Sequence, residues 1–161
     1  MASIKLTYYK NMLVSANQKV THGKANIAKP ILLLTFFELI EEGHIIGNKI
    51  HFDQLWVSTY KRIFKQYAKV ITNPEYPFYY LRNDGFYNIK GRTDKRTPSA
   101  KYLRDHCEYA YFDDALWELL QDPVSREELR NTIINHYLHL YEYTYKQTYL
   151  MNMMLHQLQK V

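Results

Sequence analysis

Residues 75–90 read EYPFYYLRNDGFYNIK, and this stretch decides how the rest of the chain is interpreted. Two short runs rich in aromatic and β-branched residues, 78–82 and 86–90, flank Asn83-Asp84-Gly85. Asparagine, aspartate and glycine tolerate the positive φ angles of a tight turn, so the pattern predicts an antiparallel β-hairpin.

The predicted hairpin combines flat apolar rings with positive charge. Proline cannot donate to a strand ladder, so Pro77 is expected at the start of the first strand, with Tyr76 extended before it in a rigid corner. The hairpin region carries Arg82, Lys90 and Arg92 against the single acid Asp84. Rings set among cations suit a nucleic-acid strand.

The composition favours one domain with a core of its own. The chain has 161 residues, and 21 Lys and Arg against 16 Asp and Glu give a formal net charge of +5, which is compatible with a polyanionic partner. The single cysteine, Cys107, excludes an internal disulfide and is interpreted as a partly buried apolar side chain. No run approaches the ~20 apolar residues of a membrane span, and no signal peptide is recognisable, so a cytoplasmic protein is expected.

Two helices are predicted in the first half of the chain. Residues 4–18 have apolar positions at helical spacing, and a basic loop at 21–26, which contains Lys24, follows them. Pro30 suits the first turn of a second helix that runs through residue 40 and stops at Gly43. Because this helix is apolar nearly all round, it is expected at the buried centre.

A third helix carries a basic face. A small hairpin at 44–52 is predicted around Gly47-Asn48, after which Asp53 can cap the helix. Trp56, Tyr60, Ile63, Phe64 and Tyr67 share one side of it, and Lys61, Lys65 and Lys69, with Arg62 beside them, lie on the other. No acid occurs between Asp53 and Glu75. The basic face is either solvated or lies along a phosphate backbone.

Three further helices are expected after a polar loop at 91–98. Ser99 can cap one through Cys107, Asp113 can cap a second through Leu119, and a capping box beginning at Ser125 can start a long third one. Along that helix, tyrosines recur at 137, 141, 145 and 149 and methionines follow them. Such a stripe is typical of core or of a subunit interface, which here would make a homodimer.

The chemistry of the common enzymes is absent from the sequence. No zinc pattern, P-loop, dinucleotide fingerprint or nucleophile elbow is present, and no nuclease pattern of spaced acids with a following lysine is found. A binding module without cofactor, metal or catalytic residues is therefore predicted.

Four segments resemble a known family. They are KPILLL at 29–34, FDQLW at 52–56, YPFYYLRNDGFY at 76–87 and DALWELLQDP at 114–123, and together they are similar to the sulfur-binding domain of McrA-like HNH restriction endonucleases. The resemblance implies recognition of phosphorothioate DNA, in which sulfur replaces a non-bridging phosphate oxygen. It also implies that an HNH nuclease, where present, is a separate domain or a partner.

The resemblance also implies the binding residues. The Tyr-Pro pair of the sulfur cavity falls on Tyr76 and Pro77, and the cation before the helix proline falls on Lys29. The chain has Ala28 where the family often has histidine, and Tyr80 where a small residue is typical. With Arg82, these residues form the predicted sulfur and phosphate site, and the predicted backbone contacts are Lys24, Lys61, Arg62, Lys65, Lys69, Lys90 and Arg92.

The sequence thus predicts a mainly helical α+β domain, winged-helix-like, with small antiparallel hairpins. It spans residues 1–161, with 143–161 as a helical extension. The predicted function is to bind double-stranded, phosphorothioate-modified DNA within a modification-dependent defence system. The alternatives are a reader of another DNA modification, a winged-helix regulator, a protein-interaction module and an unrecognised nuclease.

Overall fold

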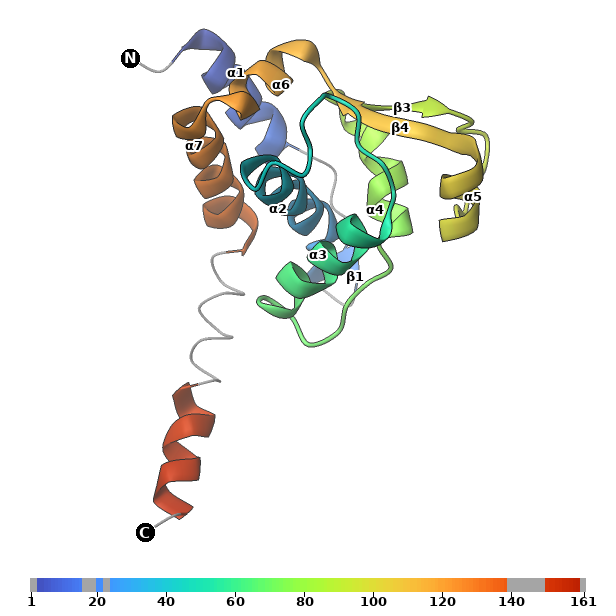
Figure 1. Cartoon of the computed structure of the whole chain (residues 1–161). Coiled ribbons are helices and arrows are strands. Elements are labelled where there is room, and N and C mark those ends of the chain that lie inside the picture. Colours follow the sequence, from blue (N-terminus) through green and yellow to red (C-terminus); the bar gives the residue numbers. More distant parts are fainter. Residues whose placement is uncertain (1–2, 16–19, 22–23, 139–149, 160–161) are drawn as a thin grey trace.

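The structure is a computed structural model that describes residues 3–15, 20–21, 24–138 and 150–159. Helix α2 (Ala28–Glu41) lies at its centre, and the other helices surround it (Figure 1). Its apolar side chains are buried on every side, as the sequence predicts, and Pro30 lies in its first turn. After the C-cap Glu42, Gly43 adopts a φ of 79° and its N–H bonds to the carbonyl of Ile40, which ends the helix at the expected glycine.

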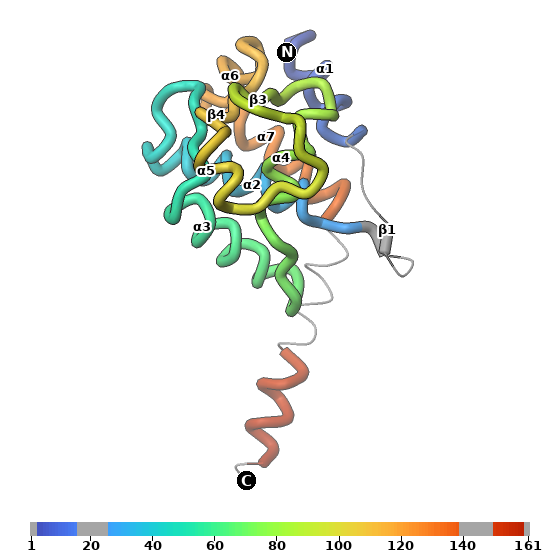
Figure 2. Tube along the Cα trace, turned by 90° about the vertical axis from the view of Figure 1, so that its right-hand side faces the viewer, coloured from blue at the N-terminus to red at the C-terminus, as the bar shows by residue number. Residues whose placement is uncertain are grey.

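Two helices lie on opposite sides of α2, and the second of them packs directly against it (Figure 2). Helix α1 (Ile4–Val14) is capped by Ser3 and ends before the predicted residue 18, with Ser15 as its C-cap. Helix α3 (Gln54–Lys65) begins at Asp53, whose carboxylate accepts a hydrogen bond from the N–H of Trp56, so the predicted cap is confirmed. Figure 2 shows α1 and α3 on opposite sides of the body, with α2 between them.

The predicted hairpin at 78–90 is wrong. Residues Glu75–Tyr80 form helix α4, and Leu81–Asp84 continue it as the 3-10 helix η1. Gly85 has the positive φ, 93°, that the turn prediction requires, but it joins a helix to a strand. Both Phe78 and Tyr79 are completely buried, and consecutive buried side chains suit a helix packed into a core better than a half-exposed strand.

The strand after Gly85 finds its partner far along the chain. Strand β3 (Tyr87–Gly91) pairs antiparallel with β4 (Cys107–Phe112), and helix α5 (Ala100–His106), capped by Ser99 as predicted, lies between them in sequence. At the bulge the Cβ of any residue replacing Gly91 would overlap the carbonyl oxygen of His106. Glycine is therefore required at this position.

Two other local predictions change. The predicted hairpin at 44–52 is wrong, because Ile50 forms its bridge with Ala110 of β4 and thereby extends that sheet instead. The predicted loop at 21–26 contains a short two-stranded sheet, β1 (Val20–Thr21) with β2 (Lys24–Ala25).

The last helices close the core. Helix α6 (Asp114–Gln121) follows Asp113, whose carboxylate accepts a hydrogen bond from the Tyr9 hydroxyl instead of capping the helix. Helix α7 (Pro123–Ile133) begins earlier than the predicted capping box, because Asp122 caps it by accepting from the N–H of Ser125.

A π-helical turn, η2 (Ile134–Leu138), continues α7. It buries Tyr137, whose hydroxyl donates to the carbonyl of Leu13 and so makes the first tyrosine of the predicted stripe a core residue. The tyrosines at 141, 145 and 149 lie outside the described residues. Residues 150–159 are helical, and the apolar side chains of that segment are exposed.

The fold class is confirmed as a mainly helical α+β domain with small antiparallel sheets. Within the described ranges, no helix has the length and apolar composition needed to span a bilayer.

Candidate nucleic-acid interface

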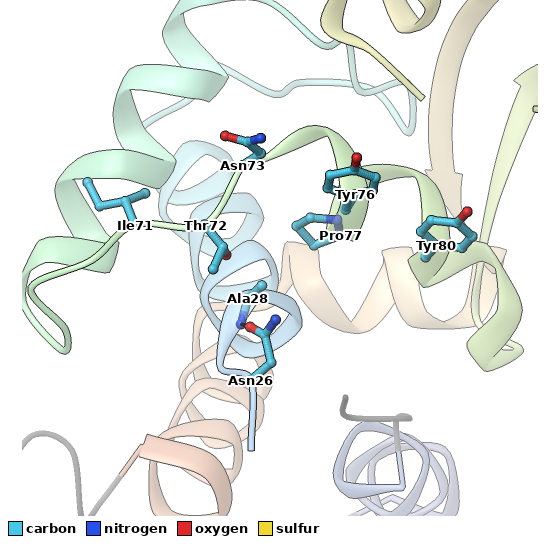
Figure 3. Close-up of a pocket in the computed structure, with 8 residues that line it drawn as sticks. All are labelled: Asn26, Ala28, Ile71, Thr72, Asn73, Tyr76, Pro77 and Tyr80. Carbon is cyan, nitrogen blue, oxygen red and sulfur yellow. Dashed lines mark hydrogen bonds between the residues drawn. The ribbon is translucent and has the colours of Figure 1, made fainter. Parts of the chain in front are cut away.

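A pocket of about 500 Å³ opens between the start of α2, the loop before α4 and α4 itself. Figure 3 shows that the residues lining the pocket come from these three segments. The lining side chains are Asn26, Ala28, Ile71, Thr72, Asn73, Tyr76, Pro77 and Tyr80.

Helix α4 supplies the aromatic wall. Tyr76 and Tyr80 are four residues apart and therefore share a helix face, with ring planes 11° from parallel and centroids 6.5 Å apart. Pro77 is buried beside them, whereas Tyr76 remains 43% exposed at the rim. The predicted Tyr-Pro corner thus lies in a pocket, although a helix and not a strand positions it.

The opposite wall comes from the start of α2 and the loop at 71–73. Ala28 is nearly fully buried, and its N–H donates to the side-chain oxygen of Asn26 over 2.8 Å. The Thr72 hydroxyl lies 3.4 Å from the hydroxyl of the core residue Tyr60. This wall therefore mixes apolar surface with amides and a hydroxyl.

Lys29 belongs to a buried ion pair and is not among the residues that line the pocket. Its Nζ lies 2.5 Å from Oδ2 of Asp84, whose side chain is only 1% exposed, against 17% for Lys29. The pair joins the start of α2 to the end of η1. Because η1 directly continues α4, the pair ties the start of α2 to the end of the helix that forms the aromatic wall.

Arg82 lies next to the pocket wall. Its guanidinium stacks over the Tyr79 ring at 3.9 Å and lies 5.5 Å from the centroid of the Tyr80 ring. Nη1 also donates to the carbonyl of Tyr79. Arg82 therefore places a fixed positive charge behind the aromatic wall.

The predicted basic face of the third helix is exposed, but α3 ends at Lys65. Lys61 and Lys65 lie at the surface of the helix, and Lys69 lies at the surface of the segment that follows it. Arg62 forms an ion pair with Glu38 of α2. None of the ion pairs found among the described residues involves the three lysines. Their charge is consequently available to a polyanion.

The other predicted backbone contacts lie elsewhere. Lys90 is 3.9 Å from a carboxylate oxygen of Glu108, and Arg92 is 3.7 Å from one of Asp94, both at exposed positions. Lys24 lies in β2, where the side chain is outside the described part of the structure. The predicted cations therefore come from β2, from α3 with the segment after it, and from β3 with the residue after it.

The structure adds four pocket residues that the sequence did not indicate: Asn26, Ile71, Thr72 and Asn73. Three of them come just before Tyr76 in the chain, but no motif marks them. Only the path of the loop against α2 brings them to the site.

The described residues offer no sign of metal or thiol chemistry. No group of three or more His, Cys, Asp or Glu side chains among them could hold a metal ion. Cys107 is half-buried, as predicted, and burial, helped by the charge of Glu108, raises the pKa of its thiol to about 11. A thiol with such a pKa is a poor nucleophile near neutral pH.

Comparison with known proteins identifies the family. A search of curated proteins found no match to the chain. The family model described as "ScoMcrA-like, DNA sulfur-binding domain" matches residues 57–157, well over half of the sequence, and the match includes α4 and the sheet of β3 and β4. The chain therefore belongs to the family of ScoMcrA-like DNA sulfur-binding domains and is a DNA-binding module.

Proposed function

We propose that this module recognises phosphorothioate DNA by placing the sulfur against Tyr76 and Pro77. The observation that supports the proposal most directly is the pocket itself. It combines the Tyr-Pro pair implied by the family resemblance with Ala28 and Tyr80, the two positions where the sequence departs from the family pattern.

An apolar wall can distinguish sulfur from oxygen by dehydration. Sulfur is larger, more polarizable and less strongly hydrated than a phosphate oxygen, which loses hydrogen bonds to water when it enters an apolar site. An unsatisfied polar group costs ~1–3 kcal/mol, which corresponds to about a ten- to hundredfold preference. Pro77 and Ala28 supply surfaces that offer an oxygen no side-chain hydrogen bond.

Attraction to the DNA backbone is a separate contribution. The proposed phosphate contacts are Lys61, Lys65 and Lys69, with Lys24, Arg62, Lys90 and Arg92 as additional cations. Arg82 strengthens the field at the pocket, and Lys29 contributes through the ion pair that positions α2. Because a phosphorothioate carries almost the same charge as a phosphate, these cations attract both kinds of DNA.

The test compares duplexes that differ only in one phosphorothioate, in both phosphorus stereoisomers and several sequences. We expect tighter binding of the sulfur-containing duplex, and loss of that preference in Tyr76→Ala and Pro77→Ala with background binding retained. Tyr8→Ala, at an exposed tyrosine of α1, is the matched control. Equal affinity of the unmutated protein for all paired duplexes would reject sulfur recognition in favour of another DNA modification.

The proposed backbone contacts are tested by salt. Replacing Lys61, Lys65 and Lys69 with alanine should weaken binding to both kinds of DNA and lower the salt slope by about 0.9 for each phosphate that is no longer neutralised. Lys5→Ala, at an exposed position on α1, should leave the slope unchanged. An unchanged slope in the triple variant would assign these three lysines to a solvated surface.

We further propose that the module serves a modification-dependent defence system in which a separate domain or partner cuts the DNA. The purified chain should bind modified DNA without cutting it when Mg²⁺ is supplied. Cleavage by the pure chain would place a nuclease within these residues.

A further inference from the structure

The pocket is much larger than a sulfur atom requires. A single sulfur is comparable in size to a water molecule, whose share of liquid volume is ~30 Å³, whereas the pocket measures about 500 Å³. Pockets of this size hold groups as large as a whole small ligand. Space therefore remains for a neighbouring part of the nucleotide when the sulfur lies on the apolar wall.

The polar part of the pocket indicates what the remaining space recognises. Two amides and a hydroxyl, from Asn26, Asn73 and Thr72, accompany the aromatic rings. Asn26 accepts a hydrogen bond from the N–H of Ala28, and Thr72 lies beside the Tyr60 hydroxyl. The Asn73 side chain forms no hydrogen bond with any residue that the structure describes.

Asn73 also occupies the exposed rim. It lies immediately before Pro74, the N-cap of α4, and its side chain is exposed to solvent. Figure 3 shows Asn73 at the same edge of the pocket as the Tyr76 hydroxyl, with Asn26 at the other end. A nucleotide whose backbone contacts Tyr76 and Pro77 would therefore bring its base edge toward this amide.

We propose that Asn73 is a specificity-determining residue that reads an adenine next to the sulfur. The proposal rests on the proposed function of the pocket. An asparagine amide offers one acceptor and a pair of donor hydrogens, which match the N6 amino group and N7 of adenine in the major groove. Guanine presents two acceptors at the corresponding positions, so the amide oxygen would have no donor to face.

The experiment uses the full chain and phosphorothioate duplexes that differ only in the base pair beside the sulfur, each with its sulfur-free counterpart. The unmutated protein should prefer adenine about tenfold or more, as expected for one bidentate contact. Asn73→Ala should bind all four duplexes about equally and still prefer sulfur. Asn73→Asp should shift the preference toward cytosine, because a carboxylate accepts from the cytosine N4 amino group.

Asn131→Ala is the matched control, since Asn131 is an exposed asparagine on α7, which contributes no residue to the pocket. It should keep the adenine preference. Two failures are distinguishable. If no duplex is favoured by its sulfur, the proposed function itself fails. If sulfur is favoured but the base beside it makes no difference, or if Asn73→Ala retains the adenine preference, base reading by Asn73 is overturned while sulfur recognition stands.

Discussion

Helix α4 has two faces built from the same kinds of side chain, and one packs into the core while the other lines the pocket. Phe78 and Tyr79 point into the core and are fully buried, whereas Tyr76 and Tyr80 line the pocket beside Pro77. The Phe78 ring makes edge contacts with the core rings of Phe36, Phe52, Trp56 and Tyr87. The Tyr76 ring contacts only the parallel ring of Tyr80 among the ring pairs of the described residues.

The difference shows how a six-residue helix can hold the proposed binding surface in place. A short helix has little stability of its own, because nucleation is costly and few hydrogen bonds follow. The buried face fixes its position through the core, and the Tyr87 hydroxyl adds a 2.6 Å hydrogen bond to the carbonyl of Phe78. The rings of Tyr76 and Tyr80 are thereby held in place at the pocket, and we expect them to contribute little to folding.

Truncating the buried face should have the largest effect. Phe78→Ala removes a fully buried ring and should lower the free energy of unfolding by ~3–5 kcal/mol, measured by urea denaturation. If that variant does not fold, Phe78→Leu, which keeps most of the volume, should show a smaller loss of about 1 kcal/mol. A stable Phe78→Ala protein with an unchanged midpoint would mean that α4 is not anchored through this ring.

Breaking the ion pair that follows α4 should have the next largest effect. Asp84→Asn leaves the Lys29 ammonium without its buried counter-charge and should cost about 3 kcal/mol of stability, the lower end of the range for buried pairs, since Lys29 keeps some contact with water. Adding Lys29→Met should restore part of the loss. Glu108→Gln, in an exposed pair with Lys90, is the control and should not move the urea midpoint. An equal shift in both variants would show that burial of the Lys29–Asp84 pair adds nothing to stability.

The long helices were predictable from the sequence, but the short helix α4, which carries the pocket residues Tyr76 and Pro77, was not. The central α2 and the capped α3 follow from apolar spacing and from Asp53. Residues 78–82 favour a strand by local propensity, but tertiary packing overrides it, because a helix buries Phe78 and Tyr79 together. Similarly, Asp122 caps α7 in place of the predicted Ser125, which lets Pro123 take the first helical position that suits it.

Only some of the residues that line the pocket were predictable from the sequence. Tyr76, Pro77 and Tyr80 were identified from the motif, and the helical i, i+4 spacing of Tyr76 and Tyr80 brings their rings to one wall. Asn73 and Thr72 were not, since their place depends on how the loop after α3 packs against the start of α2. Lys29 was expected to meet DNA directly, and no local signal in the sequence links it to Asp84, 55 residues away.

Alkaline pH should separate the buried tyrosines from the binding surface. Burial raises the pKa of Tyr87 and of Tyr60, and burial together with the nearby Asp113 carboxylate raises the pKa of Tyr9 to about 12. The unfolded chain ionises its tyrosines near pH 10, so stability contributed by these hydroxyls is complete below about pH 10 and falls as the pH rises beyond it.

Urea midpoints measured between about pH 9 and pH 11 should therefore decrease. Tyr9→Phe, which removes one of the ionising hydroxyls, should make the decrease shallower. Midpoints independent of pH across this range would contradict the burial of these hydroxyls.

The smallest effect on stability is expected at the exposed face. Tyr76→Ala removes a ring that is 43% exposed and whose ring contact is the i, i+4 pair with Tyr80, so the free energy of unfolding should fall by no more than about 0.5 kcal/mol. The same substitution should remove the preference for phosphorothioate DNA, because it removes the rim of the apolar wall. Circular dichroism and urea denaturation check the small loss of stability, and binding to paired duplexes checks the loss of the phosphorothioate preference. A loss of stability as large as that of Phe78→Ala would place the Tyr76 ring in the core and end the distinction between the two faces of α4.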